Sequence, residues 1–213
     1  MKITEVKRRR RSLYLLVLDG QEGPVVDVRT FDESPYGVDS VLTEKELEAL
    51  LACSQYNRAR DRALYLLGLR DYACRELEQK LAQEAPPEVA AAVVERLRDV
   101  GLLDDERYAS RLADSLSRTK RYPRRRVEQE LRRRGVEAEL ARGAADELEC
   151  EDFQQALALL QKRYYNKMQD EESRRKTMAA LMRRGFSYTA VRQAAQAFDE
   201  AADTQYEEIE TWL

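Results

Sequence analysis

The sequence predicts a mainly α-helical protein in which three tandem three-helix repeats form an elongated array behind a small N-terminal extension. Three observations support this fold class: the composition, an internal repeat of about fifty residues, and a strand-like beginning. Of 213 residues only eight are Gly and five are Pro, and 36% are charged, which is typical of helical proteins. We assign residues 1–57 to the extension, and 58–103, 104–149 and 150–213 to the repeats, the last with an acidic end.

The extension is predicted to contain a β-hairpin or short β-sheet and one helix. Residues 3–6, 12–18 and 24–29 are rich in Val, Leu, Ile and Tyr, and Asp19-Gly20 supplies a turn. Residues 7–11 are all basic; this run is either a charged strand edge or a nucleic-acid contact. Thr43 and Glu46 have capping-box spacing, which predicts a helix from about residue 44 to the mid-50s.

The two later repeats match each other after a shift of fifty positions. Leu131 and Gly135 fall on Leu181 and Gly185. The apolar stripe of the next helix also keeps its register: Val136, Leu140, Ala141, Ala144, Ala145 and Leu148 fall on Phe186, Ala190, Val191, Ala194, Ala195 and Phe198. Their spacing places these residues on one helical face, so we expect that face to be buried.

A first copy of the repeat lies upstream, with Leu77 and Leu81 in the equivalent positions. Its next helix carries the same stripe: Val89, Ala90, Val93, Val94 and Leu97. Here Pro86-Pro87 replaces the glycine and still separates two helices. Another helix is expected before each copy, at about 59–69, 105–119 and 151–164. Units this small are expected to stack on their neighbours.

The chain offers no catalytic constellation, so we predict a protein that is not an enzyme and needs no cofactor or metal. It has no histidine and no phosphate-binding glycine loop. Its three cysteines are widely spaced and are expected to be reduced, mostly buried thiols of a cytoplasmic protein. Residues 104–106 are acidic, as is favourable at a helix start. The apolar run 13–18 is too short to span a membrane.

The most distinctive stretch is strongly basic. Residues 118–134 contain nine Lys or Arg and two Glu, in a chain whose net charge is −3. Only Val127 and Leu131 are apolar after Pro123, so most of this helix surface is available to an anionic partner. The candidate binding residues are Arg118, Lys120, Arg121, Arg124, Arg125, Arg126, Arg132, Arg133 and Arg134, with Arg174, Arg175, Lys176, Arg183 and Arg184 in the third repeat.

Two other interpretations of this stretch remain open. A helix-turn-helix protein acting directly on DNA would fit helices joined at Gly135 or Gly185. However, residues 137–149, where the groove-reading helix would lie, contain five acids and one base. A solvated surface is the other alternative. The last fifteen residues carry six acids and no base, and form either a solvated helical end or a competitor of the anionic ligand.

Two motifs together resemble the RecX family of recombination regulators. They are GLLDDERYA at 101–109 and RRRVEQELRRRGV at 124–136, and the resemblance covers about residues 58–198. It departs from the family pattern at Tyr122-Pro123, where a glycine is common, and at Pro86-Pro87. The resemblance implies a monomeric, non-enzymatic protein that binds the RecA recombinase and its filament on single-stranded DNA through the basic residues.

By the same resemblance, binding would lower the ATPase, strand-exchange and coprotease activities of RecA. The protein would thereby affect DNA repair, homologous recombination and the SOS response.

Overall fold

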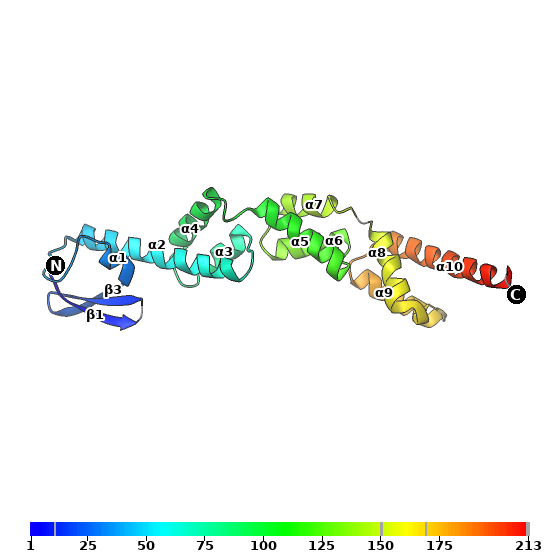
Figure 1. The fold of residues 1–213 in the computed structure, drawn as a ribbon, viewed down its shortest axis with the longest axis horizontal. Helices are drawn as coiled ribbons and strands as arrows, with labels where there is room; N and C mark the ends of the chain where they lie inside the picture. Colours follow the sequence, from blue (N-terminus) through cyan, green and yellow to red (C-terminus); the bar gives the residue numbers. More distant parts are fainter. Residues whose placement is uncertain (11, 150, 169, 212–213) are drawn as a thin grey trace. The chain divides into compact units, whose positions relative to one another are not determined.

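A computed structural model describes residues 1–10, 12–149, 151–168 and 170–211, with side chains up to residue 201. The chain divides into two compact units, Met1–Asp104 and Asp105–Leu213, which we call the N-terminal and C-terminal units (Figure 1). The first contains the extension and the first repeat, and the second contains the other two repeats. We describe each unit by itself.

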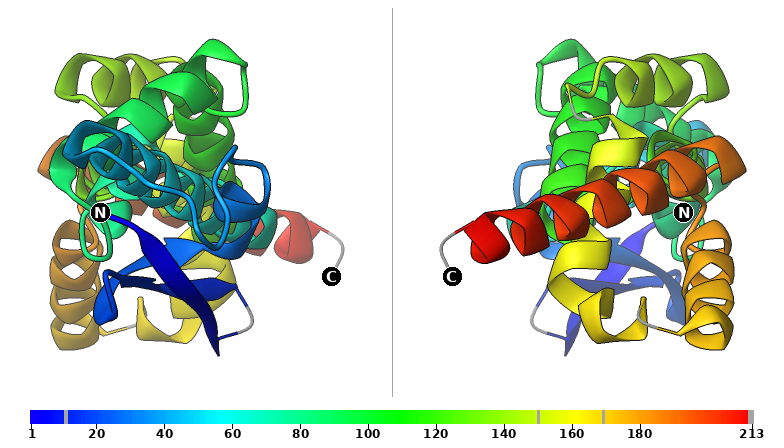
Figure 2. Two further views of the ribbon diagram at one scale, coloured as in Figure 1. Left: turned by 90° about the vertical axis from the view of Figure 1, so that its left-hand side faces the viewer. Right: turned by 90° about the vertical axis from the view of Figure 1, so that its right-hand side faces the viewer.

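The extension forms a three-stranded antiparallel sheet in the order β1-β2-β3, which confirms the predicted short sheet. The strands are β1 (Ile3–Arg10), β2 (Leu13–Leu18) and β3 (Gln21–Asp27), drawn in blue in the left view of Figure 2. Asp19 and Gly20 have φ of 52° and 83°, as a tight turn between β2 and β3 requires.

Two strand limits differ from the prediction. β1 continues to Arg10, so the exposed basic residues 7–10 belong to an edge strand rather than to a segment beside it; Arg11 lies outside the described residues. β3 ends at Asp27 because this carboxylate accepts a hydrogen bond from Thr30 N at 3.0 Å and caps the short helix α1 (Val28–Asp32). Residues 28 and 29 are therefore helical.

The predicted pair of helices at 44 to the mid-50s and 59–69 is instead one helix, α2 (Glu44–Leu69). Its capping box between Thr43 and Glu46 is present as predicted. No Gly or Pro occurs between residues 50 and 60, so nothing interrupts the backbone hydrogen bonds. The helix contributes residues to two hydrophobic cores. Leu50 packs in the core under the sheet, and Ala63 and Leu66 pack in the core of the first repeat.

The first repeat is completed by α3 (Cys74–Leu81) and α4 (Pro87–Asp99). Pro87 occupies the first turn of α4, where its missing N–H is not needed. Four of the five predicted stripe residues of α4 are buried and Val89 is partly buried. Cys74 is partly buried, but Cys53 is exposed on α2, so the expectation of burial is wrong for Cys53. Cys150 lies outside the described residues.

The C-terminal unit contains two further three-helix repeats. The second repeat consists of α5 (Asp105–Lys120), α6 (Arg124–Arg133) and α7 (Ala138–Asp146). The third begins with α8 (Asp152–Leu159), which continues as a π-helical turn η1 (Leu160–Tyr164) and a 3-10 turn η2 (Tyr165–Lys167) where a regular helix was predicted to residue 164. It ends with α9 (Glu171–Arg183) and α10 (Tyr188–Thr211), orange to red in the right view of Figure 2.

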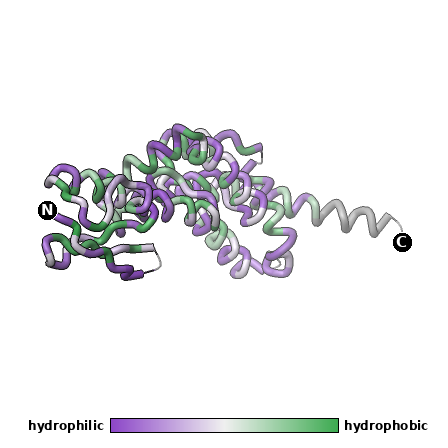
Figure 3. Tube along the Cα trace, turned by 60° about the vertical axis from the view of Figure 1, so that its left-hand side comes forward, coloured by the Kyte–Doolittle hydropathy of each residue, from purple (hydrophilic) through white to green (hydrophobic). Residues whose placement is uncertain are grey.

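The predicted fifty-residue correspondence is confirmed by burial. Leu131 and Leu181 are both fully buried, and so are Ala141 and Val191. Of the twelve stripe residues only Leu140 is partly exposed. Hydrophobic and hydrophilic residues alternate along these helices in Figure 3. The predicted acidic end begins on α10, but its side chains from residue 202 lie outside the described residues.

Hydrogen bonds join the second repeat to the third within the C-terminal unit. Gln155 Nε2 donates to Ser117 Oγ at 2.6 Å, and both side chains are buried. The backbone N of Arg124 donates to Asp152 Oδ1 at 2.9 Å. Within the second repeat, Arg124 Nη2 donates to the Leu148 carbonyl at 2.7 Å, just before the boundary. The bond to Asp152 fixes the start of α6 against the start of α8.

Gly185 lies against the start of α6 across this junction, and its replacement by Ala should destabilise the C-terminal unit. Gly185 has a φ of +106°, and an added Cβ would lie 3.1 Å from Arg126 Cβ. We expect Gly185→Ala to lower the free energy of unfolding by about 1–3 kcal/mol, measured by urea denaturation followed by helical circular dichroism. Gly101→Ala is the control, since Gly101 has a positive φ but open space around it. Equal losses in both variants would contradict the close approach.

Candidate functional site

The turn between α5 and α6 places an arginine in a left-handed backbone conformation. Arg121 has a φ of +53°, and the turn closes through hydrogen bonds from Arg121 N to the Ser117 carbonyl and from Tyr122 N to the Leu116 carbonyl. The turns after α6 and α9 are one residue tighter, with bonds from Val136 N to the Leu131 carbonyl and from Phe186 N to the Leu181 carbonyl, and their left-handed residues are Gly135 and Gly185. Glycine adopts this conformation readily, whereas other residues lose roughly 1–2 kcal/mol. The turn therefore carries a basic side chain at an energetic cost.

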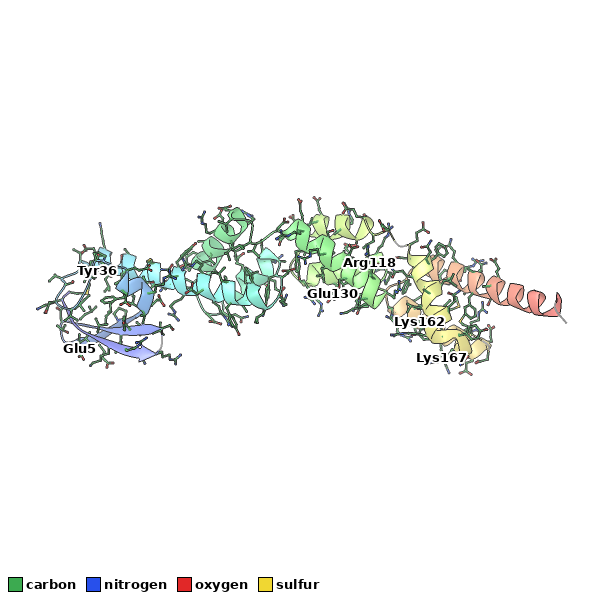
Figure 4. All side chains as sticks on the ribbon, in the orientation of Figure 1. Glu5, Tyr36, Arg118, Glu130, Lys162 and Lys167 are labelled. Atoms are coloured by element: carbon green, nitrogen blue, oxygen red, sulfur yellow. The ribbon has the colours of Figure 1, made fainter. Side chains whose placement is uncertain are left out.

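Beside this turn lies a pocket of about 470 Å³, which we call the basic pocket. It is bounded by the end of α5 and its turn, by α8 with η1, and by the end of α9. Figure 4 labels Arg118 on its α5 side and Lys162 on its η1 side. Its described lining residues include six bases and no acid: Arg118, Thr119, Lys120, Arg121, Tyr122, Ala158, Leu159, Lys162, Arg163 and Arg184.

Only four of the fourteen residues predicted from the sequence line the basic pocket: Arg118, Lys120, Arg121 and Arg184. The hydrogen bond from Arg184 Nη2 to the Lys120 carbonyl, at 3.2 Å, holds the α9 side against the α5 turn. Arg126 lies next to the pocket, with its guanidinium carbon 5.6 Å from the centre of the Tyr122 ring. Arg125 and Arg183 are exposed on α6 and α9.

Most of the other predicted residues are held by neighbouring carboxylates. Arg133 and Arg134 both approach the buried carboxylate of Glu130. The remaining ion pairs are Arg132–Glu128, Arg174–Asp199, Arg175–Glu171 and Lys176–Glu172. Exposed pairs of this kind contribute little to stability and can be exchanged for a ligand.

Two of these pairs shift pKa values. The hydrogen bond from Arg133 lowers the pKa of Glu130 below its ordinary value, and burial acts in the opposite direction. The hydrogen bond with Asp199 raises the pKa of Arg174. Glu130 is therefore ionised at neutral pH and fixes Arg133 and Arg134 on the α6 surface.

Arg124 has a structural role that the sequence did not reveal. Its backbone N binds Asp152 of the third repeat, its side chain binds the Leu148 carbonyl at the end of the second repeat, and the residue is partly buried. A residue used in this way is less available to a partner than Arg125 beside it.

Sequence reasoning missed Lys162 and Arg163 on η1, and Tyr122 as part of the pocket. The Lys-Arg pair is an isolated basic dipeptide that begins 28 residues after the end of the basic stretch, and only the fold brings the two together. The π-helical turn at 160–164 is a signal of a kind often found at functional sites.

Comparison with known families accounts for all three repeats. Residues 59–97 match a model described as the first three-helix domain of RecX. Residues 104–144 and 149–195 match the second and third three-helix domains of RecX.

The chain belongs to the RecX family.

Individual RecX proteins are similar over most of their length. The chain is 37% identical over 137 residues to regulatory protein RecX of Trichlorobacter lovleyi, covering 62% of this chain and 89% of the relative. It is 25% identical over 207 residues to regulatory protein RecX of Streptococcus sanguinis, covering 96% of this chain and 80% of the relative. These relatives place the chain among regulatory proteins.

Two solved RecX structures share the fold. One crystal structure of regulatory protein RecX aligns with a TM-score of 0.65 and 22% identity, covering 92% of this chain and 98% of the other. The crystal structure of RecX from Lactobacillus salivarius aligns with a TM-score of 0.62 and 19% identity, covering 69% of this chain and 98% of the other. The basic pocket combines residues of the second and third RecX domains. Within the described residues, no helix is long and apolar enough to cross a membrane.

Proposed function

We propose that this RecX-family protein binds the RecA recombinase and its filament on single-stranded DNA, and lowers the ATPase, strand-exchange and coprotease activities of RecA. It does so without catalysis of its own, as a monomer in the cytoplasm. It thereby restrains DNA repair by homologous recombination and the SOS response. The family membership supports a regulatory role, and the surface chemistry supports an anionic nucleoprotein partner.

The observation that carries the proposal is the gathering of basic side chains in the C-terminal unit. Six of them surround one pocket without an acid among its described lining residues. Exposed Arg125 and Arg183 add further positive charge on α6 and α9. A surface of this kind attracts a nucleic-acid backbone, whose phosphates dominate affinity for basic proteins.

The charge on α7 disfavours the alternative of a helix-turn-helix protein acting on DNA without a recombinase. This helix follows the turn at Gly135 and would have to enter the major groove. Its exposed positions include Glu139 and Asp146, with Arg142 as the only base. Phosphates on both sides of the groove would repel such a helix.

Adding the purified protein to RecA on circular single-stranded DNA should reduce ATP hydrolysis in a dose-dependent way. The rate of phosphate release measures this effect. A gel-shift experiment with a set of duplexes of different sequence, run with and without RecA, separates the two functions. Unchanged ATP hydrolysis together with retardation of a particular duplex in the absence of RecA would overturn the proposal in favour of direct DNA regulation.

A further inference from the structure

The basic pocket differs in charge from two other hollows among the described residues. Beside α2 and α3, a smaller pocket contains Arg58 and Arg62, but Glu84 also lines it and lies 3.3 Å from Arg62. A third hollow is lined by both a base, Arg75, and an acid, Glu78. The basic pocket has six bases, and the ion pairs of the described C-terminal unit use other basic residues. Mutual repulsion in such a hollow is relieved by a bound anion.

Local backbone strain supports a binding role for the pocket. Arg121 has a left-handed φ of +53°, a conformation that Gly135 and Gly185 adopt at the ends of α6 and α9. Strained conformations of non-glycine residues are concentrated at functional sites, where the side chain is needed. A side chain at this position lines the pocket, whereas glycine would supply the same turn without the charge.

The pocket also offers a surface for a flat ring. Tyr122 is partly buried and lines the pocket between Lys120, whose Nζ lies 5.7 Å from the ring centre, and Arg126. Ala158 and Leu159 form an apolar part of the opposite wall. Cations beside an aromatic ring are the combination by which proteins hold single-stranded nucleic acids, with phosphates on the cations and a base stacked on the ring.

We propose that the basic pocket binds a nucleotide of a single-stranded nucleic acid, with its phosphate among the basic side chains and its base against Tyr122. The inference rests on the proposed function, because the DNA strand of the filament supplies this ligand. A base within a duplex is stacked between its neighbours and cannot reach the ring, which favours a single strand. An acidic polypeptide would use the cations but would leave the aromatic wall without a role.

Charge reversal on η1 tests the site without RecA. Fluorescence anisotropy of a labelled oligothymidylate, titrated with the full-length protein, gives the affinity. We expect Lys162→Glu with Arg163→Glu to weaken binding at least tenfold. The matched control, Arg142→Glu with Arg192→Glu, makes the same charge change at exposed positions on α7 and α10 outside the pocket and should change affinity less than threefold. Equal weakening in both variants would overturn the site and leave only a general charge effect.

Salt and competitors identify the ligand. Removing one cation that binds a phosphate should reduce the slope of log affinity against log salt by roughly 0.7, so the η1 variant should show a shallower slope. Unlabelled oligothymidylate should displace the probe at far lower concentration than thymidine monophosphate, pyrophosphate or polyglutamate. If polyglutamate displaces the probe as effectively as the oligonucleotide does, the ligand is not specifically a nucleic acid and the assignment is overturned. If thymidine monophosphate displaces it equally well, the proposal that the ligand is a nucleic-acid strand is overturned.

Variants of the turn separate binding from folding. Tyr122→Ala should weaken binding several-fold, and Tyr122→Phe should restore it because the ring is kept. Arg121→Gly should weaken binding several-fold while the melting temperature stays the same or rises, since the strain is removed with the charge. A lower melting temperature with unchanged binding would show that Arg121 and the pocket serve structure alone, and would overturn the proposal.

The same variants distinguish this inference from the proposed function. If the η1 variant binds the oligonucleotide as tightly as the unaltered protein, while the unaltered protein inhibits RecA, then the pocket assignment fails and the regulatory function stands. If pocket-dependent binding is found but RecA is unaffected, the nucleotide site stands and the proposed partner fails.

Discussion

Reversing Arg125, Arg132 and Arg183 to Glu should raise the concentration needed to half-inhibit RecA on the order of a hundredfold. All three side chains are exposed on α6 or α9, and only Arg132 has an ion-pair partner among the described residues, Glu128 at 3.8 Å. Each reversal replaces an attraction to phosphate or to an acidic protein surface by a repulsion. The measurement is DNA-dependent ATP hydrolysis by RecA over a range of concentrations of the variant.

The control for this experiment carries the same change in net charge elsewhere. Arg96, Arg142 and Arg192 are exposed on α4, α7 and α10 and do not belong to the candidate residues. Their reversal should alter the half-inhibiting concentration by less than about fivefold, since distant charges are screened at physiological salt. Helical circular dichroism verifies that both triple variants are folded. If both lose inhibition to the same degree, α6 and α9 do not form the contact surface.

The repeats could be predicted from the sequence because their signals are local and repeated. A left-handed glycine followed by a buried stripe recurs as Gly135 with Ala141 and as Gly185 with Val191, and each signal supports the other. The fused helix α2 was harder to predict. Its middle has neither a breaker nor a cap, and an amphipathic pattern does not reveal that one helix contacts two successive cores.

The candidate site could be predicted only in part, because charge in a sequence does not show which cations are already used. The run from Arg124 to Arg126 appears uniform, yet its members differ: the Arg124 side chain bonds to the Leu148 carbonyl, Arg125 faces solvent, and Arg126 lies beside Tyr122. Lys162 and Arg163 gain their significance from tertiary structure alone. The prediction that all fourteen basic residues contact the partner remains a proposal, and the geometry favours testing the exposed and pocket residues first.

Arg124→Glu should lower the free energy of unfolding of the C-terminal unit by about 2–4 kcal/mol. The Arg124 guanidinium donates to the Leu148 carbonyl at 2.7 Å, and the backbone N binds the Asp152 carboxylate at 2.9 Å. A glutamate at this position would remove the charged hydrogen bond and face both a carbonyl oxygen and a second carboxylate. Urea denaturation followed by circular dichroism measures the loss.

The neighbouring variant Arg125→Glu provides the comparison, because Arg125 is exposed one position further along α6 and its reversal should change stability by at most about 0.5 kcal/mol. Equal stability of the two variants would show that the side-chain bond to the Leu148 carbonyl contributes nothing. If they differ as expected, loss of RecA inhibition in Arg124→Glu reflects a weakened fold of the C-terminal unit. The same loss in Arg125→Glu, whose fold is intact, would then identify a contact with the partner.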